Sequence, residues 1–420
     1  SYSSITDVLD NLFVTKEGAV QTEEDIHKEQ LKLSKILADE CPKSQTRPFA
    51  LFAIDCTPTP RLYANKLEDR SFVHAPNPVP GQDPITVGHQ YSWLTFLPDY
   101  EPDKNAHWVV PLSVRRVKFE EKGHLVGMQQ LEEIISDSKE NPFLKQLCVS
   151  VTDSAYTVKT CRTVAERNDN WINISRMRSN QVVFRQAPSL PKGQRPKGRP
   201  RLYGEKIHVN EVSEWDEEGG FSYVTQKKKK KVTVQMKRLN NVVTRGAGGA
   251  PFDVLVATAV NEEGTPLYKR SLVLAISGKR RKELSCRQVY ESYGQRFDIE
   301  HYFRFGKQHL LNTASQTPDV RHEENWMWIS LLAYNMLYHS RKLASPSYRP
   351  WETARRAKEH ILPPTQVQRD YTAIYQRIGT PARDPKPRGK SFGRKKGDRR
   401  PPRPHCPIKK KPEKEVAEVI

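Results

Sequence analysis

The sequence is short of apolar residues and has no long hydrophobic run. Hydrophobic residues make up 36% of its 420 residues, and the mean hydropathy is −0.74. No apolar stretch approaches the roughly 20 residues that a helix needs to span a bilayer, so the sequence offers no candidate for such a helix. The length corresponds to about two to three domains. Because the apolar content is low for one compact globule, we expect part of the chain to be open basic surface or disordered.

Cysteine is also scarce, and its spacing argues against two common uses. The six cysteines include no C-x2-C pair, which is typical of neither a zinc site nor a disulfide framework. We find no secretory signal peptide and expect reduced thiols in a cytoplasmic protein. The chain begins at Ser1 rather than Met, which leaves open whether native residues precede it.

Acidic residues are outnumbered by basic ones. The chain has 69 Lys and Arg against 49 Asp and Glu, which gives a formal net charge of +20 and an isoelectric point near 9.6. Such an excess predicts a polyanionic partner, with nucleic acid ahead of an anionic membrane surface. Because the basic residues are clustered, solubility alone is a weak explanation for them.

Composition and hydrophobic pattern divide the chain into six segments. They are an N-terminal helical segment (1–46), the first part of an α/β core (47–179), a β-rich insertion (180–276), closing core helices (277–345), a C-terminal helical segment (346–379) and a basic Pro-rich tail (380–420). Within the core we expect strands at 49–54, 85–96, 107–117, 147–152 and 171–175, and helices at 128–136 and 158–167. The tail is too poor in apolar residues to fold alone, so we expect it to be disordered and to bind nucleic acid without sequence preference.

Two basic patches interrupt the predicted insertion. Residues 192–201 contain a Gly-Arg-Pro core similar to AT-hook segments, whose arginines, here Arg199 and Arg201, enter the minor groove of A·T-rich DNA. A flexible basic loop explains the same composition equally well. Residues 227–231 are five consecutive lysines, which favour nonspecific attraction to phosphates.

An amphipathic helix is expected at residues 293–307, with several charged side chains on one face. At about 100° per residue, one arc of about 60° holds one acid, two bases and a phenol: Glu300, Arg296, Lys307 and Tyr293. A solvated charged face with i,i+4 pairs is the ordinary interpretation. Against it, Phe297 lies beside the arc. One carboxylate among cations suggests a site for metal and phosphate.

Two further acids follow apolar runs of strand length. Asp55 comes after 49–54 and Asp153 after 147–152, and unbroken apolar runs are typical of central strands covered on both faces. Parallel strands end at the same edge of a sheet, so we expect the two aspartates to lie side by side there. Each one alone could be a turn former or a helix cap.

With Glu300, we expect three acids to converge on this edge. Three hard oxygen ligands suit Mg²⁺, or Mn²⁺ as its substitute, rather than zinc. Two such ions activate water or a 3′-hydroxyl and stabilise the leaving oxygen during attack on a phosphodiester. The neighbouring bases would hold the flanking phosphates.

The spacing Tyr293-x2-Arg296-x3-Glu300-x6-Lys307 matches, without a gap, the Y-x2-R-x3-E-x6-K signature of the DDE transposases of bacterial insertion sequences. Asp55 in Ile-Asp-Cys-Thr resembles the first aspartate of this family, and Asp153 in Val-Thr-Asp-Ser resembles the second. The similarity covers roughly residues 47–345. The short N-terminal region and the basic tail depart from the family pattern.

The resemblance implies an α/β fold: a ribonuclease-H-like catalytic core interrupted by a β-rich insertion, with a helical N-terminal segment and a disordered basic C-terminal tail. It implies cut-and-paste transposition in the bacterial nucleoid, by a homodimer on the terminal inverted repeats, with strand transfer to target DNA and often a hairpin intermediate. It also implies that Asp55, Asp153 and Glu300 bind two metal ions. DNA-contacting residues would be Tyr293, Arg296, Lys307 and the basic pair Arg176 and Arg178. A tryptophan in the insertion of this family supports a flipped base. Trp215 is the only tryptophan of the predicted insertion, and no motif anchors it in that role.

Two other functions remain open from the sequence. One is a ribonuclease-H-like nuclease or resolvase that cuts DNA without strand transfer. The other is a domesticated, non-catalytic DNA-binding relative of a transposase. The presence of all three acids argues against the second.

Overall fold

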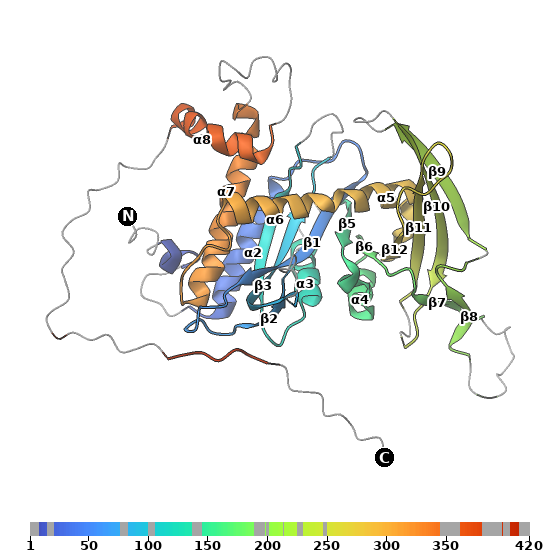
Figure 1. Ribbon diagram of the computed structural model, residues 1–420, viewed down its shortest axis with the longest axis horizontal. Coiled ribbons are helices and arrows are strands. Elements are labelled where there is room, and N and C mark those ends of the chain that lie inside the picture. The colour runs from blue at the N-terminus through green and yellow to red at the C-terminus, as the bar shows by residue number, and fades with distance from the viewer. Residues whose placement is uncertain are drawn as a thin grey trace.

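The computed structural model describes most of the chain and is built around one mixed sheet (Figure 1). The described residues are 8–14, 21–75, 83–99, 106–136, 145–188, 198, 201–212, 214–224, 230–246, 250–344, 362–379, 397 and 404–410. Within them, ten strands form the sheet in the order β2-β3-β1-β5-β6-β12-β11-β10-β9, with β4 paired to β3. None of the helices in these ranges is long and apolar enough to cross a bilayer.

The elements have the following bounds. The sheet strands are β1 (Phe49–Pro60), β2 (Ser71–His74), β3 (Ile85–Phe96), β4 (Val110–Val117), β5 (Leu147–Thr152), β6 (Trp171–Arg176), β9 (Glu217–Val224), β10 (Lys231–Val242), β11 (Phe252–Val260) and β12 (Leu272–Ser277). The helices are α2 (Glu23–Asp39), α3 (Gly123–Ile135), α4 (Lys159–Arg167), α5 (Cys286–Gln295), α6 (Phe297–His309), α7 (Val320–Ala344) and α8 (Pro364–Ile378). The predicted strands and helices of the core are confirmed, with shifts of a few residues at their ends.

The topology of the core is consistent with the expected ribonuclease-H-like fold. Strand β3 pairs antiparallel with both β1 and β4, whereas β5 and β6 run parallel to β1. The connections to the parallel strands pass through α3 and α4, as parallel pairing requires. Together these elements form a mixed α/β layer structure.

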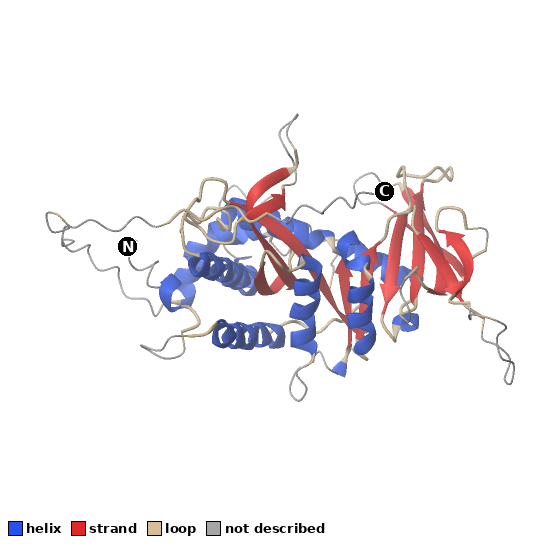
Figure 2. Ribbon diagram, turned by 90° about the horizontal axis from the view of Figure 1, so that it is seen from below, coloured by secondary structure: helices blue, strands red, loops and turns tan. Residues whose placement is uncertain are grey.

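Helices cover both faces of the central strand β1 (Figures 1 and 2). Its apolar run is buried from Phe49 to Ile54, which explains why a continuous hydrophobic stretch forms a central strand. On one face, Gly127 of α3 lies so close to Ile54 that a Cβ would be 2.5 Å from its side chain. On the other face, Tyr302 of α6 packs edge-on against Trp93 of β3, with ring centroids 5.4 Å apart. Successive residues of β1 alternate between these two faces.

The strands of the predicted insertion continue the same sheet. Strand β12 pairs antiparallel with β6, and β11, β10 and β9 follow it outward to the right-hand end of Figure 1. The remaining two strands, β7 (Val182–Gln186) and β8 (Tyr203–His208), form a separate two-stranded sheet. Residues 180–276 thus contain strands β7 to β12, and the pairing of β12 with β6 joins four of them to the sheet of the α/β core.

Part of the C-terminal tail was predicted wrongly. Residues 404–410 are described, and they lie against the edge strand β2 and the loop before it. The Cys406 N–H donates to Asn65 O at 2.8 Å, the Lys409 N–H donates to Arg70 O at 2.8 Å, and Lys409 pairs with Ser71 as a parallel bridge. Composition predicted disorder because the segment has little apolar surface, but an open sheet edge offers backbone hydrogen bonds that need no apolar side chain. Apart from Gly397, the rest of the tail lies outside the described residues.

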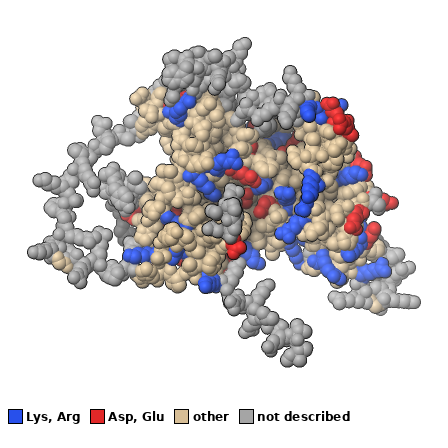
Figure 3. Space-filling model, in the orientation of Figure 1, with Lys and Arg blue, Asp and Glu red and all other residues tan. Residues whose placement is uncertain are grey.

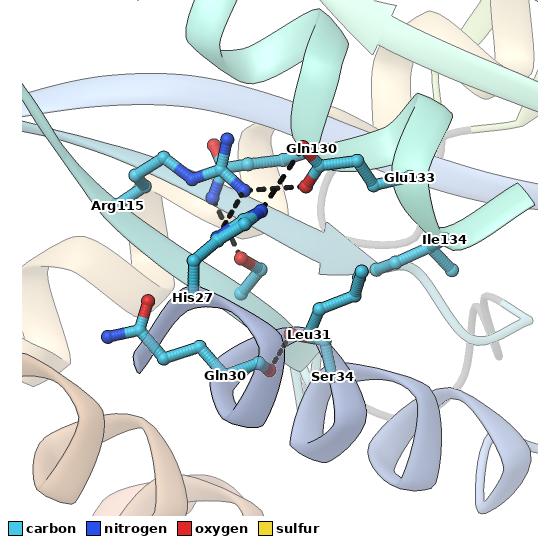
Figure 4. A pocket seen from close by; sticks show the side chains of 9 residues that line it. His27, Gln30, Leu31, Ser34, Arg115, Gln130, Glu133 and Ile134 are labelled. Carbon is cyan, nitrogen blue, oxygen red and sulfur yellow. Dashed lines mark hydrogen bonds and ion pairs between the residues drawn. The ribbon is translucent and has the colours of Figure 1, made fainter. Parts of the chain in front are cut away.

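Helix α2 is held to the core by an ion-pair cluster in a small cavity between α2, α3 and β4 (Figure 4). Arg115 Nη2 of β4 donates to Glu133 Oε2 at 2.6 Å, and His27 Nε2 of α2 lies 3.3 Å from Glu133 Oε1. Despite its partial burial, these two partners lower the pKa of Glu133 to about 2. The charged form of Glu133 therefore stabilises the folded state.

Replacing Glu133 by Gln is expected to flatten the loss of stability in acid. The pKa of Glu133 is lower in the folded than in the unfolded chain, so its contribution is complete above a pH of about 4.5 and is lost as the pH falls toward about 2. With allowance for solvent screening, we expect the contribution to be about 1 to 2 kcal/mol. Urea unfolding from pH 6 to pH 2.5 measures it. Glu24→Gln, at an exposed position on α2, is the control. Equal acid sensitivity of Glu133→Gln and wild type would contradict the assignment.

Candidate active site

The register of two parallel strands brings two acids to the same end of the sheet. The last pair between β1 and β5 is Ala53 with Val151, and this register, continued for two residues, would set Asp55 opposite Asp153. The charge of Asp153 acts on Asp55, which agrees with that placement. Both side chains then point to one face, because facing positions of parallel strands share an orientation. The sequence placed Asp55 after its strand, and that boundary was wrong. Strand β1 continues to Pro60 because it pairs with β3, where Asp55 faces Trp93.

Asp153 directly follows β5 and also caps the next turn. Its Oδ1 accepts a hydrogen bond from the Ala155 N–H at 2.9 Å, at the start of the 3₁₀ turn η2 (Ser154–Thr157). The capping role that the sequence left open is thus present. It occupies one carboxylate oxygen and fixes the direction of the side chain.

Arg296 joins Asp55 to Glu300. Its Nη1 donates to Asp55 Oδ2 at 2.9 Å, and its Nη2 donates to Glu300 Oε1 at 2.5 Å. One guanidinium therefore holds the acid of β1 and the acid of α6. Of the three side chains, Glu300 is the most open, with 44% of its side chain exposed.

The predicted single helix at 293–307 is two helices that meet at Arg296. Helix α5 ends at Gln295 and α6 begins at Phe297, and the Arg296 N–H donates to Tyr293 O three residues earlier instead of four. This tightened turn is of the 3₁₀ type. Periodicity could not locate the break, because the residues on both sides keep helical dihedral angles.

The remaining members of the arc also face the sheet. Lys307 Nζ donates to Thr57 Oγ1 on β1 at 2.6 Å, and burial lowers the pKa of Lys307. Tyr293 is buried, which raises its pKa, while the nearby Arg296 and Arg176 guanidinium groups oppose that rise. Thr57 was missed by the sequence reasoning. Its signal was the period of two along β1, which places it on the same face as Asp55.

The electrostatics around Asp55 favour a cation. Burial is the largest cause that raises the pKa of Asp55 to about 6, and the charge of Asp153 raises it further, while Arg296 lowers it. The Cys56 N–H donates to Asp55 Oδ1 at 2.8 Å. Two carboxylates that share a partly buried site repel each other, and positive charge between them relieves the repulsion.

The oxygen donors fit a hard divalent ion, but their arrangement is not a ready metal site. Among the residues that the structure describes, no three His, Cys, Asp or Glu side chains are grouped closely enough to hold a metal ion. The Arg296 guanidinium stands between Asp55 and Glu300, so Glu300 is free to act as a ligand once this ion pair opens. Cys56 does not compete, because it lies 3.9 Å from Tyr156 OH and burial raises its thiol pKa to about 12.

The other predicted DNA-binding residues lie on different elements from the three acids. Arg176 ends β6, and Arg178 is exposed just beyond it. Arg201 is exposed just before β8, in the small sheet at the lower right of Figure 1 and away from β1 and β5. Arg199 lies outside the described residues. Trp215 is partly buried against the hydrophobic core of the insertion, an ordinary packing position.

Comparison with known proteins gives one match. Residues 22–241, just over half of the chain, match the family described as DDE superfamily endonuclease. No curated protein matches the chain. The matched range includes Asp55 and Asp153 and ends before the helices that carry Arg296 and Glu300. On this match, together with the α/β core that positions the two aspartates, the chain belongs to the DDE superfamily endonucleases.

Proposed function

We propose that this DDE endonuclease is a DNA transposase that works by cut-and-paste. It would cut DNA at the terminal inverted repeats of a bacterial insertion sequence and join the freed ends to target DNA. One observation carries the proposal: the β1–β5 register, continued for two residues, would set Asp55 opposite Asp153, and Arg296 ties Asp55 to Glu300. These contacts support the proposal that Asp55, Asp153 and Glu300 act together at one end of the sheet.

In this proposal Asp55, Asp153 and Glu300 hold two Mg²⁺ ions, with Mn²⁺ as a substitute. When bound, the ions supply an activated water or 3′-hydroxyl and stabilise the leaving oxygen. Arg296 would hold Asp55 and Glu300 together before the metal ions bind. Its guanidinium would then turn to a phosphate of the cut DNA strand. Lys307 donates to Thr57 Oγ1, which keeps its ammonium group beside β1. From there it would contact the same cut DNA strand.

The distribution of charge supports DNA as the substrate. Figure 3 shows Lys and Arg side chains gathered where the strands of the core meet those of the insertion. Tyr293, Arg296 and Lys307 would contact the cleaved end, with Arg176 and Arg178 beside them. Arg199 and Arg201 would contact DNA further along.

The remaining assignments follow from the resemblance. The protein would act in the nucleoid as a homodimer on DNA. The reaction would pass through a DNA hairpin intermediate. We retain the six-segment division of the chain as the working domain structure.

Joining of a pre-cut DNA end separates a transposase from a nuclease. A labelled element end with a free 3′-hydroxyl, incubated with supercoiled plasmid and Mg²⁺, is expected to become covalently attached to the plasmid by the wild-type protein. Glu300→Gln should abolish joining, whereas Glu291→Gln, an exposed position on α5, should not. Cutting of an uncut end without any joining would instead favour the nuclease, and DNA binding without either reaction would favour the non-catalytic relative.

A further inference from the structure

A cationic cleft lies between the α/β core and the insertion. It has a volume of about 370 Å³. Its lining comes from the start of α4, from the segments that follow β6 and β10, and from one residue each of β11 and β12. Its basic side chains are Lys159, Arg162 and Arg245, and none of the described residues that line it is acidic. The volume is in the range of small-ligand sites. The charge on its walls selects for an anion.

Arg162 is a buried cation that has no carboxylate partner among the residues that the structure describes. Its residue is 4% exposed, and its guanidinium lies 4.5 Å from the centroid of the Phe252 ring. Nη1 donates to Thr157 O at 2.8 Å and Nη2 donates to Thr244 Oγ1 at 2.7 Å, while Nε has no hydrogen-bond partner among the described residues. Burial lowers the pKa of Arg162 to about 10, so the side chain is still charged at neutral pH.

The other buried arginines among the described residues have their partners within the protein. Arg70 donates from all three of its side-chain nitrogens to backbone carbonyl groups, and the remaining three pair with carboxylates. Arg61 pairs with Glu323, and Arg238 and Arg281 both pair with Asp253. A buried charge without such a partner is strongly unfavourable. Among the described residues, no carboxylate neutralises Arg162 and no acceptor pairs with its Nε. A bound anion would supply both.

The start of α4 adds further attraction for an anion at this cleft. Helix α4 begins at Lys159, and its N-cap residue Val158 makes no side-chain hydrogen bond to the first turn. The first N–H groups of a helix are unpaired and carry partial positive charge, which favours anions and disfavours a cation such as Lys159. A bound anion that contacts both the Lys159 ammonium group and the first backbone N–H groups of α4 best explains a lysine at this position.

We propose that the cleft binds a backbone phosphate of the DNA strand through Arg162, Lys159 and the N-terminus of α4. The inference rests on the proposed function and deepens it by placing a second phosphate contact beyond the carboxylates. The chain geometry connects the two sites, since the cleft starts at Thr157 and Asp153 caps the same η2 turn. A strand held at Asp153 would continue toward the insertion. A phosphate monoester or free phosphate has the same chemistry, and the test separates these sources.

Lys159→Gln tests the inference without risk to the fold, because Lys159 is exposed. We would measure fluorescence anisotropy of a labelled element-end duplex in EDTA between 50 and 200 mM salt, so that binding is read without catalysis. Lys159→Gln is expected to weaken binding by about threefold to tenfold and to reduce the salt slope by about 0.9. Lys28→Gln removes the same charge from an exposed position on α2 and should change neither. Equal affinity and slope for the two variants would overturn the inference.

Arg162→Met provides a second measurement on the free protein. If Arg162 awaits a phosphate, the substitution should lower DNA affinity at least as much as Lys159→Gln and leave the melting temperature near that of wild type, since it removes an uncompensated buried charge. A lowered melting temperature with wild-type DNA affinity would show a structural role and contradict the inference.

Inorganic phosphate distinguishes the two sources of the ligand. If phosphate raises the melting temperature of wild type but Lys159→Gln does not weaken DNA binding, the cleft takes free phosphate and the inference for DNA fails. Wild-type joining activity together with unchanged DNA binding by Lys159→Gln would reject the cleft and leave the proposed function standing. Absence of DNA binding by the wild-type protein would reject the proposed function itself.

Discussion

Replacing Asp55 by Asn is expected to lower the rate of DNA-strand cleavage by at least about a hundredfold. The amide keeps the shape of the side chain and removes the negative charge through which Asp55 binds a cation. Electrostatic stabilisation by a bound metal is worth several kcal/mol in the transition state, and each factor of ten in rate corresponds to about 1.4 kcal/mol. Time courses of cleavage of a labelled element end in Mg²⁺ measure the effect.

The fold of this variant should be retained. Arg296 loses one carboxylate partner but keeps Glu300, and the backbone pairing of β1 with β3 does not depend on the side chain. Asp169→Asn is the matched control, because Asp169 is exposed and its ion pair with Lys279 lies at the surface. Cleavage at the wild-type rate by Asp55→Asn would remove Asp55 from the active site.

The largest expected loss of stability comes from Glu323→Gln. Glu323 of α7 is completely buried, and its Oε2 accepts from Arg61 Nε at 2.5 Å. Its Oε1 accepts from Tyr91 OH at 2.9 Å and lies 2.8 Å from His89 Nδ1. Loss of the carboxylate leaves the buried Arg61 charge without a counter-ion, which costs about 3 to 5 kcal/mol. Urea unfolding at pH 7 gives the change in the free energy of unfolding.

The neighbouring residue supplies a close control. Glu324 is adjacent in α7, but its ion pair with Arg116 is partly exposed, with 30% of the Glu324 side chain open to solvent. Glu324→Gln should therefore cost no more than about 1 kcal/mol. If the two variants lose equal stability, burial of the Glu323 cluster is not what holds α7 to the sheet.

The sequence could predict features that depend on local pattern. The apolar runs at 49–54 and 147–152 gave central strands, and helical periodicity placed Arg296 and Lys307 on one face, where both contact β1. These succeed because burial on both faces, or on one helical face, leaves a mark on consecutive residues. The same local pattern could not show that α5 and α6 separate at Arg296.

Contacts between residues far apart in the sequence could not be predicted from local pattern. The extension of β1 to Pro60 depends on β3, and the attachment of the insertion depends on the pairing of β12 with β6. The buried pair of Arg61 and Glu323 joins residues 262 positions apart. Neither residue has an unusual neighbourhood in the sequence, so their partnership follows only from the folded chain. The unpaired Arg162 could not be recognised for the same reason.

The most direct test of a single site is the rate of cleavage by wild type, Asp55→Asn, Glu300→Gln and the double variant. Residues that act as one unit have strongly non-additive effects. We predict that each single substitution lowers the rate by at least about a hundredfold and that the double variant loses little more than the worse single one. A wild-type rate for either single variant, or losses that multiply in the double variant, would contradict a shared site for Asp55 and Glu300.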